Sequence, residues 1–351
     1  MRASGFAYTE PSAGFWPLEY DVEPGPADAV VKVAGCGLCH TDVGFYFGDV
    51  VPRAKLPLVL GHEISGTVEA AGEEATDLVG RQVVVPSVMP CGDCPRCKGG
   101  YPNTCVRQFM PGNDGHGGFA DRIVVPARYL ALLPDQLGKY ELADLSVIAD
   151  AVTTPYQSVI RSGIKPGDVA VVVGVGGIGT YAVQIARAFG AFVLAIDIDN
   201  DKLERIRNHG ADVVFNPRGI DRRDIRKAVR HLVTGGGHPD FAWKIFEMSG
   251  SKAGQELAYQ LLPPSGTLAV VGFTLDKLEL RLSNLMAFDA TCFGNWGCAP
   301  ELYPDAIQLV LDGRVDLQPF IKKHSLDQIQ PLFEAAHAGA LSERAILVPS
   351  D

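Results

Sequence analysis

The sequence lacks any apolar run that approaches the roughly 18 residues of a membrane-spanning helix. Its first fourteen residues, MRASGFAYTEPSAG, also lack the apolar core of a secretory signal peptide. Basic residues are outnumbered, 31 against 41 acidic ones, and the net charge of −10 argues against nucleic acid as a partner. No internal repeat or low-complexity segment is evident. These absences favour an ordinary cytoplasmic globular protein without a membrane partner, and 351 residues predict two domains.

Four of the eight cysteines stand within fifteen residues, in the stretch CGDCPRCKGGYPNTC. Four thiolates so close together can converge on one tetrahedral Zn²⁺ and leave no open coordination position. A disulfide pair and four unused thiols are the alternatives, and the reducing cytosol disfavours the disulfides. The spacing therefore predicts a structural zinc ion bound by Cys91, Cys94, Cys97 and Cys105.

A glycine-rich turn follows an apolar, β-branched run in the middle of the chain. Residues 168–173 read DVAVVV and lead into GVGGIG at 174–179, after which apolar residues recur at helical spacing. In a G-x-G-x-x-G turn the first glycine permits the tight turn, the second lets a pyrophosphate approach the backbone, and the third lets helix and strand pack closely. The order strand, glycine turn, helix predicts a dinucleotide-binding site.

An acidic residue stands at the end of the next apolar strand, FVLAID, eighteen residues beyond the last glycine. Asp197 would accept hydrogen bonds from the adenosine ribose, and it would repel a 2′-phosphate as a like charge, so we expect NAD rather than NADP. The predicted cofactor contacts in this region are Gly174, Gly176, Gly177, Gly179, Asp197 and Lys202.

Strands and helices alternate through the rest of this region. We expect helices at 203–209, 220–233 and 253–262, and strands at 213–215, 242–246 and 267–271. Such alternation predicts an α/β fold with a Rossmann-type, doubly wound parallel sheet. Before this region the short β-type runs VVKVAG, GTVEAAG and RQVVVPS, punctuated by glycine and proline, predict a mostly β domain of partly open barrel type.

Two short motifs in the β-rich region complete a pattern that covers the chain. They are GCGLCHTD at residues 35–42 and GHE at 61–63. Together with the four-cysteine loop and the dinucleotide turn, their order and spacing resemble the zinc-dependent medium-chain alcohol dehydrogenases. That resemblance implies a GroES-like catalytic domain carrying the structural zinc loop, beside the Rossmann domain.

The resemblance also implies a catalytic zinc ion, so that each subunit would hold two zinc ions and NAD. Cys39 and His62 match the first ligands, Thr41 matches the hydroxyl that takes the alcohol proton, and Glu63 matches the acid beside the metal. His40 would contact the cofactor pyrophosphate. The third ligand of many relatives is a cysteine, but the matching segment DAVTTPYQSV offers Asp150, whose carboxylate is a sound zinc ligand. Asp150 capping the following helix is the alternative.

Two positions depart from the family pattern, and three cysteines lack a role. Gly44 stands where the proton relay usually ends in a histidine, and Pro300 stands where relatives often have an arginine. Cys36, Cys292 and Cys298 have no assigned role, and we expect them to be buried as small residues.

Several longer strings, among them VMPCGDC, MPGNDGHGGFA and WKIFEMSG, are similar to the subgroup that acts on 6-hydroxycyclohex-1-ene-1-carbonyl-CoA. The resemblance implies NAD-dependent oxidation of this acyl-CoA to the 6-oxo compound, in anaerobic benzoyl-CoA degradation. CoA phosphates require cations, for which Arg53 and Lys55 are candidates, although loop cations are usually only solvated. The aromatic stretch 45–47 would line a ring pocket or belong to the core. Further pocket candidates are Met110, Asn113, Asp114, Asn295 and Trp296.

The same residues leave three other functions open. A general NAD-dependent alcohol or polyol dehydrogenase would share every zinc and glycine position. A zinc-free reductase or a non-catalytic nucleotide-binding protein would have the same scaffold, and the complete zinc motifs argue against both. We expect a catalytic domain at 1–151 with its zinc loop at 91–105 and a Rossmann domain at 152–294, and the resemblance implies that residues 295–351 return to the catalytic domain. Homodimers or homotetramers are typical of the family.

Overall fold

A computed structural model describes residues 1–350 of the chain, which forms two compact units. The first unit contains Met1–Thr153, Gly297–Leu311 and the segment from Leu317 onward. The second contains Thr154–Trp296 and Asp312–Asp316. Among the described residues, no helix is long and apolar enough to cross a membrane.

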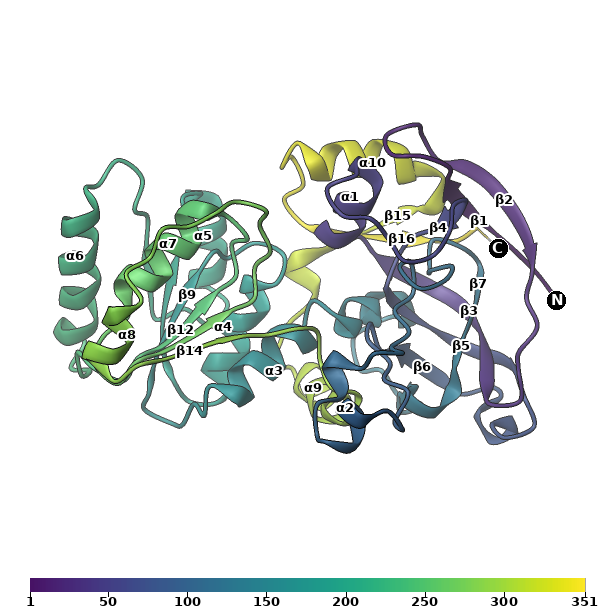
Figure 1. The fold of residues 1–351 in the computed structure, drawn as a ribbon, viewed down its shortest axis with the longest axis horizontal. Helices are drawn as coiled ribbons and strands as arrows, with labels where there is room; N and C mark the ends of the chain where they lie inside the picture. Colours follow the sequence, from purple (N-terminus) through teal and green to yellow (C-terminus); the bar gives the residue numbers. More distant parts are fainter. Residues whose placement is uncertain (351) are drawn as a thin grey trace. The chain divides into compact units, whose positions relative to one another are not determined.

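The second unit is built on a six-stranded parallel sheet with the strand order β11-β10-β9-β12-β13-β14. From β9 the chain moves outward to β10 and β11, then returns beside β9 with β12 and moves outward the other way. Right-handed crossovers in the two directions place helices on both faces of the sheet (Figure 1). The predicted doubly wound sheet is confirmed, and its strand order reverses between β9 and β12, where such sheets bind ligands at the carboxyl ends of their strands.

The elements of the second unit follow the apolar pattern of the sequence. The strands at residues 169–173, 192–196 and 213–215 read as continuous apolar runs, which is typical of parallel strands covered on both faces. The strand Val213–Phe215 has the predicted bounds. The elements are α3 (Thr153–Arg161), β9 (Val169–Val173), α4 (Gly179–Ala188), β10 (Phe192–Ile196), α5 (Asn200–Arg207), β11 (Val213–Phe215), α6 (Arg222–Gly235), β12 (Lys244–Glu247), α7 (Lys252–Leu261), β13 (Thr267–Val270), α8 (Ser283–Phe288) and β14 (Thr291–Gly294).

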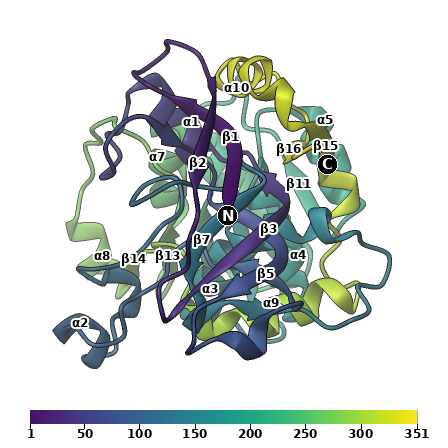
Figure 2. The ribbon, with the colours of Figure 1, turned by 90° about the vertical axis from the view of Figure 1, so that its right-hand side faces the viewer.

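The first unit is mostly β, as predicted. A seven-stranded sheet has the order β15-β16-β3-β5-β6-β8, with β7 also paired to β3, and a three-stranded sheet has the order β2-β1-β4. Figure 2 shows the antiparallel strands β1 and β2 side by side. The strands are β1 (Arg2–Tyr8), β2 (Trp16–Asp21), β3 (Asp28–Gly37), β4 (Leu58–Val59), β5 (Glu63–Ala71), β6 (Gln82–Val85), β7 (Arg122–Pro126), β8 (Ala131–Leu132), β15 (Ile321–Ser325) and β16 (Arg344–Val348).

Short helices connect these strands. The α-helices are α1 (His40–Phe47), α2 (Pro95–Lys98), α9 (Tyr303–Leu311) and α10 (Ile329–His337). The 3₁₀ helices are η1 (Thr76–Leu78), η2 (Pro102–Thr104), η3 (Ala127–Tyr129), η4 (Leu142–Ala149), η5 (Pro300–Leu302), η6 (Gln318–Phe320) and η7 (Leu326–Gln328). Helices α9 and α10 and strands β15 and β16 come from the C-terminal part of the chain, so segments distant in sequence build the first unit.

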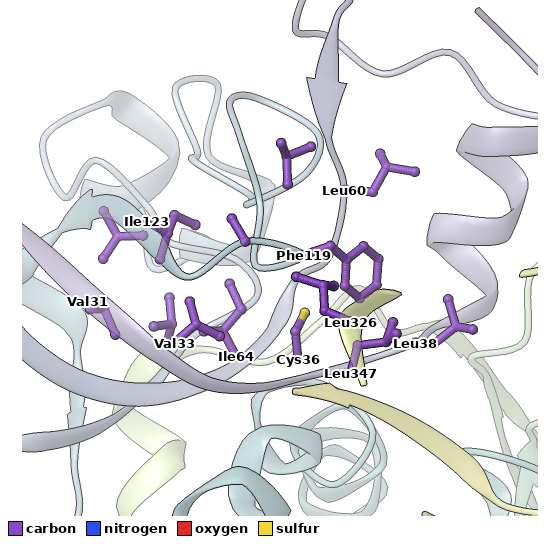
Figure 3. Close-up of a cluster of buried hydrophobic side chains, with 14 of the residues drawn as sticks. Val31, Val33, Cys36, Leu38, Leu60, Ile64, Phe119, Ile123, Leu326 and Leu347 are labelled. Atoms are coloured by element: carbon purple, nitrogen blue, oxygen red, sulfur yellow. The ribbon is translucent and has the colours of Figure 1, made fainter. Parts of the chain in front are cut away.

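The core of the first unit lies against the inner face of β3 and β5. Figure 3 shows Val31, Val33 and Cys36 from β3 packed with Ile64 from β5 and Phe119, together with Leu326 and Leu347 from the C-terminal part. Phe45 and Tyr46 are buried in this cluster and Phe47 packs against it, so the aromatic stretch belongs to the core. Cys36 and Cys298 are buried as expected, but Cys292 is exposed on β14, and the expectation was wrong there.

Candidate metal centres and cofactor turn

The four cysteines of the loop at 91–105 converge in space. Their sulfur atoms all lie within 4.8 Å of one another, and all are free thiols. Backbone N–H groups of Cys91 and Arg107 donate to the Cys105 sulfur at 3.2 and 3.3 Å. Backbone N–H groups of Cys97 and Val106 lower the pKa of the Cys94 thiol to about 6. Burial, by contrast, raises the pKa of the Cys97 thiol to about 12. Four sulfur atoms this close together fit a tetrahedral zinc ion, which deprotonates the thiols that it binds.

The Arg107 side chain adds a positive charge to this loop. Its guanidinium donates to the Cys91 sulfur at 3.5 Å and pairs with Asp93. A zinc ion with four thiolates carries a net negative charge, which a nearby guanidinium offsets. The sequence motif alone gave no role to Arg107.

A second cluster gathers Cys39, His62, Glu63 and Asp150, with one ligand atom of each within 4.8 Å of the others. Strands β3 and β5 pair so that Gly37 lies opposite Glu63, which brings the residues after β3 to those that begin β5. Cys39 stands at the N-cap of α1, and Asp150 follows η4. One Asp150 carboxylate oxygen lies 3.8 Å from the Cys39 sulfur and 3.7 Å from His62 Nε2.

The other two predicted residues of this region stand on the first turn of α1. Thr41 lies with its hydroxyl 3.8 Å from the Cys39 sulfur, so the structure brings it to the cluster. His40 is the first residue of α1 and is exposed. Gly44 has only Asp49 and Val50 within 4 Å of the position that a side chain would occupy.

A buried aspartate, which sequence reasoning missed, orients the histidine. Asp42 is fully buried and accepts hydrogen bonds from the backbone N–H groups of Cys39 and Gly61, at 3.1 and 3.0 Å. It also accepts from Nδ1 of His62 at 3.1 Å. This contact places the ring proton on Nδ1 and turns the lone pair of Nε2 toward the cluster. The signal in the sequence was an acid three residues after Cys39, which reads equally as a helix cap.

Arg344, whose role the sequence did not indicate, pairs with the carboxylate of Glu63. Glu63 is fully buried and pairs with Arg344 at 2.7 Å. Burial raises the pKa of Glu63 to about 7, against the lowering effect of Arg344. In the described part of the chain its second carboxylate oxygen, Oε2, has no hydrogen-bond partner. A thiol, an imidazole and two carboxylates, one with an unsatisfied oxygen, fit a zinc ion.

The glycine turn after β9 has the shape that a dinucleotide requires. A side chain at Gly174 would meet Ser249 at 2.6 Å, and one at Gly179 would lie 1.8 Å from the Gly174 carbonyl oxygen. At Gly176, by contrast, a side chain would meet nothing within 4 Å, so this position needs no glycine for the packing of the chain itself. The open space at Gly176 and the start of α4 fit the approach of a pyrophosphate.

Asp197 follows β10 and holds this turn. Its carboxylate accepts from the backbone N–H of Val175 at 2.8 Å and from that of Asp199 at 3.0 Å. A carboxylate has room for further donors, so ribose hydroxyls remain acceptable. Gly177 is exposed in the turn, and Lys202 is half-buried on the first turn of α5.

The candidate CoA cations lie in the loop before β4. The Arg53 side chain pairs with Asp114 at 3.2 Å, and its backbone N–H donates to Asn113 at 3.2 Å. Lys55 is exposed. In the second unit Asn295 accepts from Gln157 at 3.0 Å, and Trp296 is half exposed.

Comparisons with known proteins agree with this geometry. Residues 25–135 match the model of the alcohol dehydrogenase GroES-like domain, and residues 177–312 match that of the zinc-binding dehydrogenases. An alcohol dehydrogenase from Geobacillus stearothermophilus is 32% identical over 322 residues, 91% of each chain.

Solved structures share the whole fold. The alcohol dehydrogenase of Aeropyrum pernix superposes with a TM-score of 0.87 at 28% identity, over 99% of this chain and 100% of that one. Galactitol-1-phosphate dehydrogenase from Escherichia coli gives a TM-score of 0.87 at 25% identity, with the same coverage.

Proposed function

The chain belongs to the zinc-dependent medium-chain alcohol dehydrogenase family, and from this premise we propose that it oxidises an alcohol to a carbonyl compound with NAD. The family makes the protein an oxidoreductase that acts on CH–OH groups. The observation that carries the proposal for this chain is the cluster of Cys39, His62, Glu63 and Asp150, which brings ligand atoms from three separate segments of the sequence within 4.8 Å of one another.

In this proposal Cys39, His62 and Asp150 hold a catalytic zinc ion. Zinc supplies a Lewis acid, which lowers the pKa of an alcohol toward neutrality. Asp42 fixes the orientation of the His62 ring, and Arg344 balances the charge of Glu63. These two contacts hold the side chains of His62 and Glu63 in place within the cluster. Thr41 lies beside Cys39 and takes the alcohol proton.

The glycine turn holds the cofactor, and NAD supplies the hydride acceptor. Gly176 admits the pyrophosphate, Gly174, Gly177 and Gly179 shape the turn, and Asp197 binds the ribose and disfavours a 2′-phosphate. Lys202 and His40 add cationic or polar contacts to the cofactor. The four cysteines at 91–105 hold a structural zinc ion.

The substrate class that the relatives support is a general alcohol or polyol, because the names of similar proteins include alcohol dehydrogenases and a polyol-phosphate dehydrogenase. A cyclic hydroxyacyl-CoA is a second candidate. It is supported by the loop MPGNDGHGGFA, which binds the backbone and the side chain of Arg53 and holds that cation on the surface, 58% exposed.

The test is NADH formation by the zinc-loaded protein with NAD and each of three substrates. These are 2-propanol, cyclohexanol and 6-hydroxycyclohex-1-ene-1-carbonyl-CoA. Saturable turnover of the simple alcohols supports the general assignment. Turnover of the thioester at micromolar levels with poor use of the free alcohols would replace it by the acyl-CoA assignment, and no turnover of any alcohol would reject both.

A homo-oligomer formed through the edge of the parallel sheet completes the proposal. Strand β14 is the last in the sheet order, and Thr291, Cys292 and Gly294 on it are exposed. Leu282 and Met286 nearby in the chain are 68% and 78% exposed. An exposed edge strand presents unpaired backbone N–H and C=O groups, and a second copy of the chain would cover them together with the nearby apolar side chains.

A further inference from the structure

The ligand carboxylate of Asp150 is held from the side away from the other ligands. Its Oδ2 faces Cys39 and His62, whereas its Oδ1 lies 3.4 Å from the hydroxyl of Ser87, which donates to it. Ser87 follows β6 and is 1% exposed. The two oxygens are therefore distinguished by their partners, and only one is directed to the ligand cluster.

A tyrosine from the C-terminal part of the chain fixes this arrangement. Tyr303, the first residue of α9, is fully buried. Its hydroxyl accepts from the backbone N–H of Ser87 at 3.1 Å and donates to the carbonyl of Ala149, the residue before Asp150. Tyr303, 216 residues from Ser87 in sequence, thus ties the segment that carries the Ser87 hydroxyl to the segment that carries the Asp150 carboxylate.

The hydrogen bonds of Tyr303 matter because the groups that they join are buried. A phenol with one donor and two lone pairs can bridge an N–H and a carbonyl at the same time, and in a buried site both groups need partners. The Thr153 hydroxyl also donates to the Ala149 carbonyl, at 3.1 Å, so the carbonyl retains a partner without Tyr303. The Ser87 N–H, by contrast, would lose its partner in a phenylalanine variant.

We propose that Ser87 and Tyr303 are positioning residues for the metal ligand Asp150: the serine hydroxyl holds Oδ1, and the tyrosine holds the backbone N–H of Ser87 and the carbonyl of Ala149, which precedes Asp150. The inference rests on the proposed zinc site of Cys39, His62 and Asp150. Partners that orient a metal ligand typically change metal affinity by ~10- to 100-fold when they are removed. A tyrosine that only fills the core would change stability and leave metal affinity unaltered.

The test compares Tyr303→Phe, Ser87→Ala and Ser87→Thr with the unmodified protein and with Tyr20→Phe. Tyr20 donates a phenol hydrogen bond to the Arg122 carbonyl at 3.2 Å, and neither residue belongs to the ligand cluster, so its loss controls for the removal of one phenol. Zinc affinity is measured by competition with a chelator. The visible spectrum of Co²⁺-loaded protein is recorded as a difference against Asp150→Ala, which isolates the site.

We expect Tyr303→Phe and Ser87→Ala to weaken zinc binding about 10- to 100-fold and to shift the Co²⁺ difference spectrum. Ser87→Thr, which keeps the hydroxyl, and Tyr20→Phe should resemble the unmodified protein. In an Asp150→Ala background the Ser87→Ala change should have no further effect on metal affinity.

Unchanged affinity and spectrum in Ser87→Ala would overturn the proposal, and this variant decides the matter if Tyr303→Phe fails to fold. An unmodified protein that binds one metal ion per chain, held by the four cysteines, would instead overturn the proposed catalytic site. The two failures are therefore distinguishable.

Discussion

Alanine substitutions in the glycine turn after β9 separate the packing of the chain from the binding of its cofactor. A methyl group at Gly179 would lie 1.8 Å from the Gly174 carbonyl oxygen, whereas ordinary contact begins at 3.4 Å. The backbone of the turn would have to move so that the Gly174 carbonyl oxygen and the new methyl group reach ordinary contact distance. At Gly176 and at Gly235, at the end of α6, a methyl group would meet nothing within 4 Å.

The three substitutions should therefore differ in kind. Gly179→Ala should lower the free energy of unfolding by about 1–3 kcal/mol, as overpacking does, and should also weaken NADH binding. Gly176→Ala should leave the unfolding free energy within about 0.5 kcal/mol, yet weaken NADH binding about 10- to 100-fold, because the methyl group takes the place of the pyrophosphate. Gly235→Ala should change neither property by more than about 1 kcal/mol.

Urea unfolding and titration of NADH fluorescence measure the two properties on the same samples. Gly235→Ala controls for the general effect of replacing a glycine. Full NADH affinity in Gly176→Ala would contradict this prediction. It would mean that the cofactor pyrophosphate does not occupy the open space beside Gly176.

Three further predictions concern other parts of the molecule. Asp197→Gly should raise the preference for NADP over NAD by about tenfold or more, since the like charge facing the 2′-phosphate is gone; kcat/KM for both cofactors checks this. Cys94→Ser should release the structural zinc and lower the unfolding temperature, whereas Cys292→Ser, on exposed β14, should do neither. Metal analysis and thermal unfolding of both variants check this, and full zinc content in Cys94→Ser would contradict it. Leu282→Glu combined with Met286→Glu should reduce the oligomer size in light scattering, and an unchanged mass would reject the β14 interface.

The local motifs were predictable because each is encoded by neighbouring residues. The spacing of the cysteines at 91–105 and the apolar strand before Gly174 needed no long-range information. The alternation of strands and helices also predicted the parallel sheet. The ends of the helices differ by a few residues, because the helix N-caps set them: Asp199 starts its helix earlier than the apolar pattern does, and Asp221 starts its helix later.

Other features depend on contacts that no local pattern reports. Arg344 lies 281 residues from Glu63, and Tyr303 lies 216 residues from Ser87, so their roles emerge only when the C-terminal segment joins the first unit. Asp42 reads as an ordinary helix cap until its contact with His62 is seen. Helix α8 and strand β14 were not predicted, because their exposed apolar side chains obscure the usual alternation.

The most direct test of the account measures zinc content and NADH formation on one preparation of the unmodified protein and one of Asp150→Ala. We expect two zinc ions per chain and alcohol-dependent NADH formation in the unmodified protein, as the two ligand groups require. We expect one zinc ion and no NADH formation in Asp150→Ala. Full zinc content and activity in that variant would contradict the assignment of the catalytic metal site.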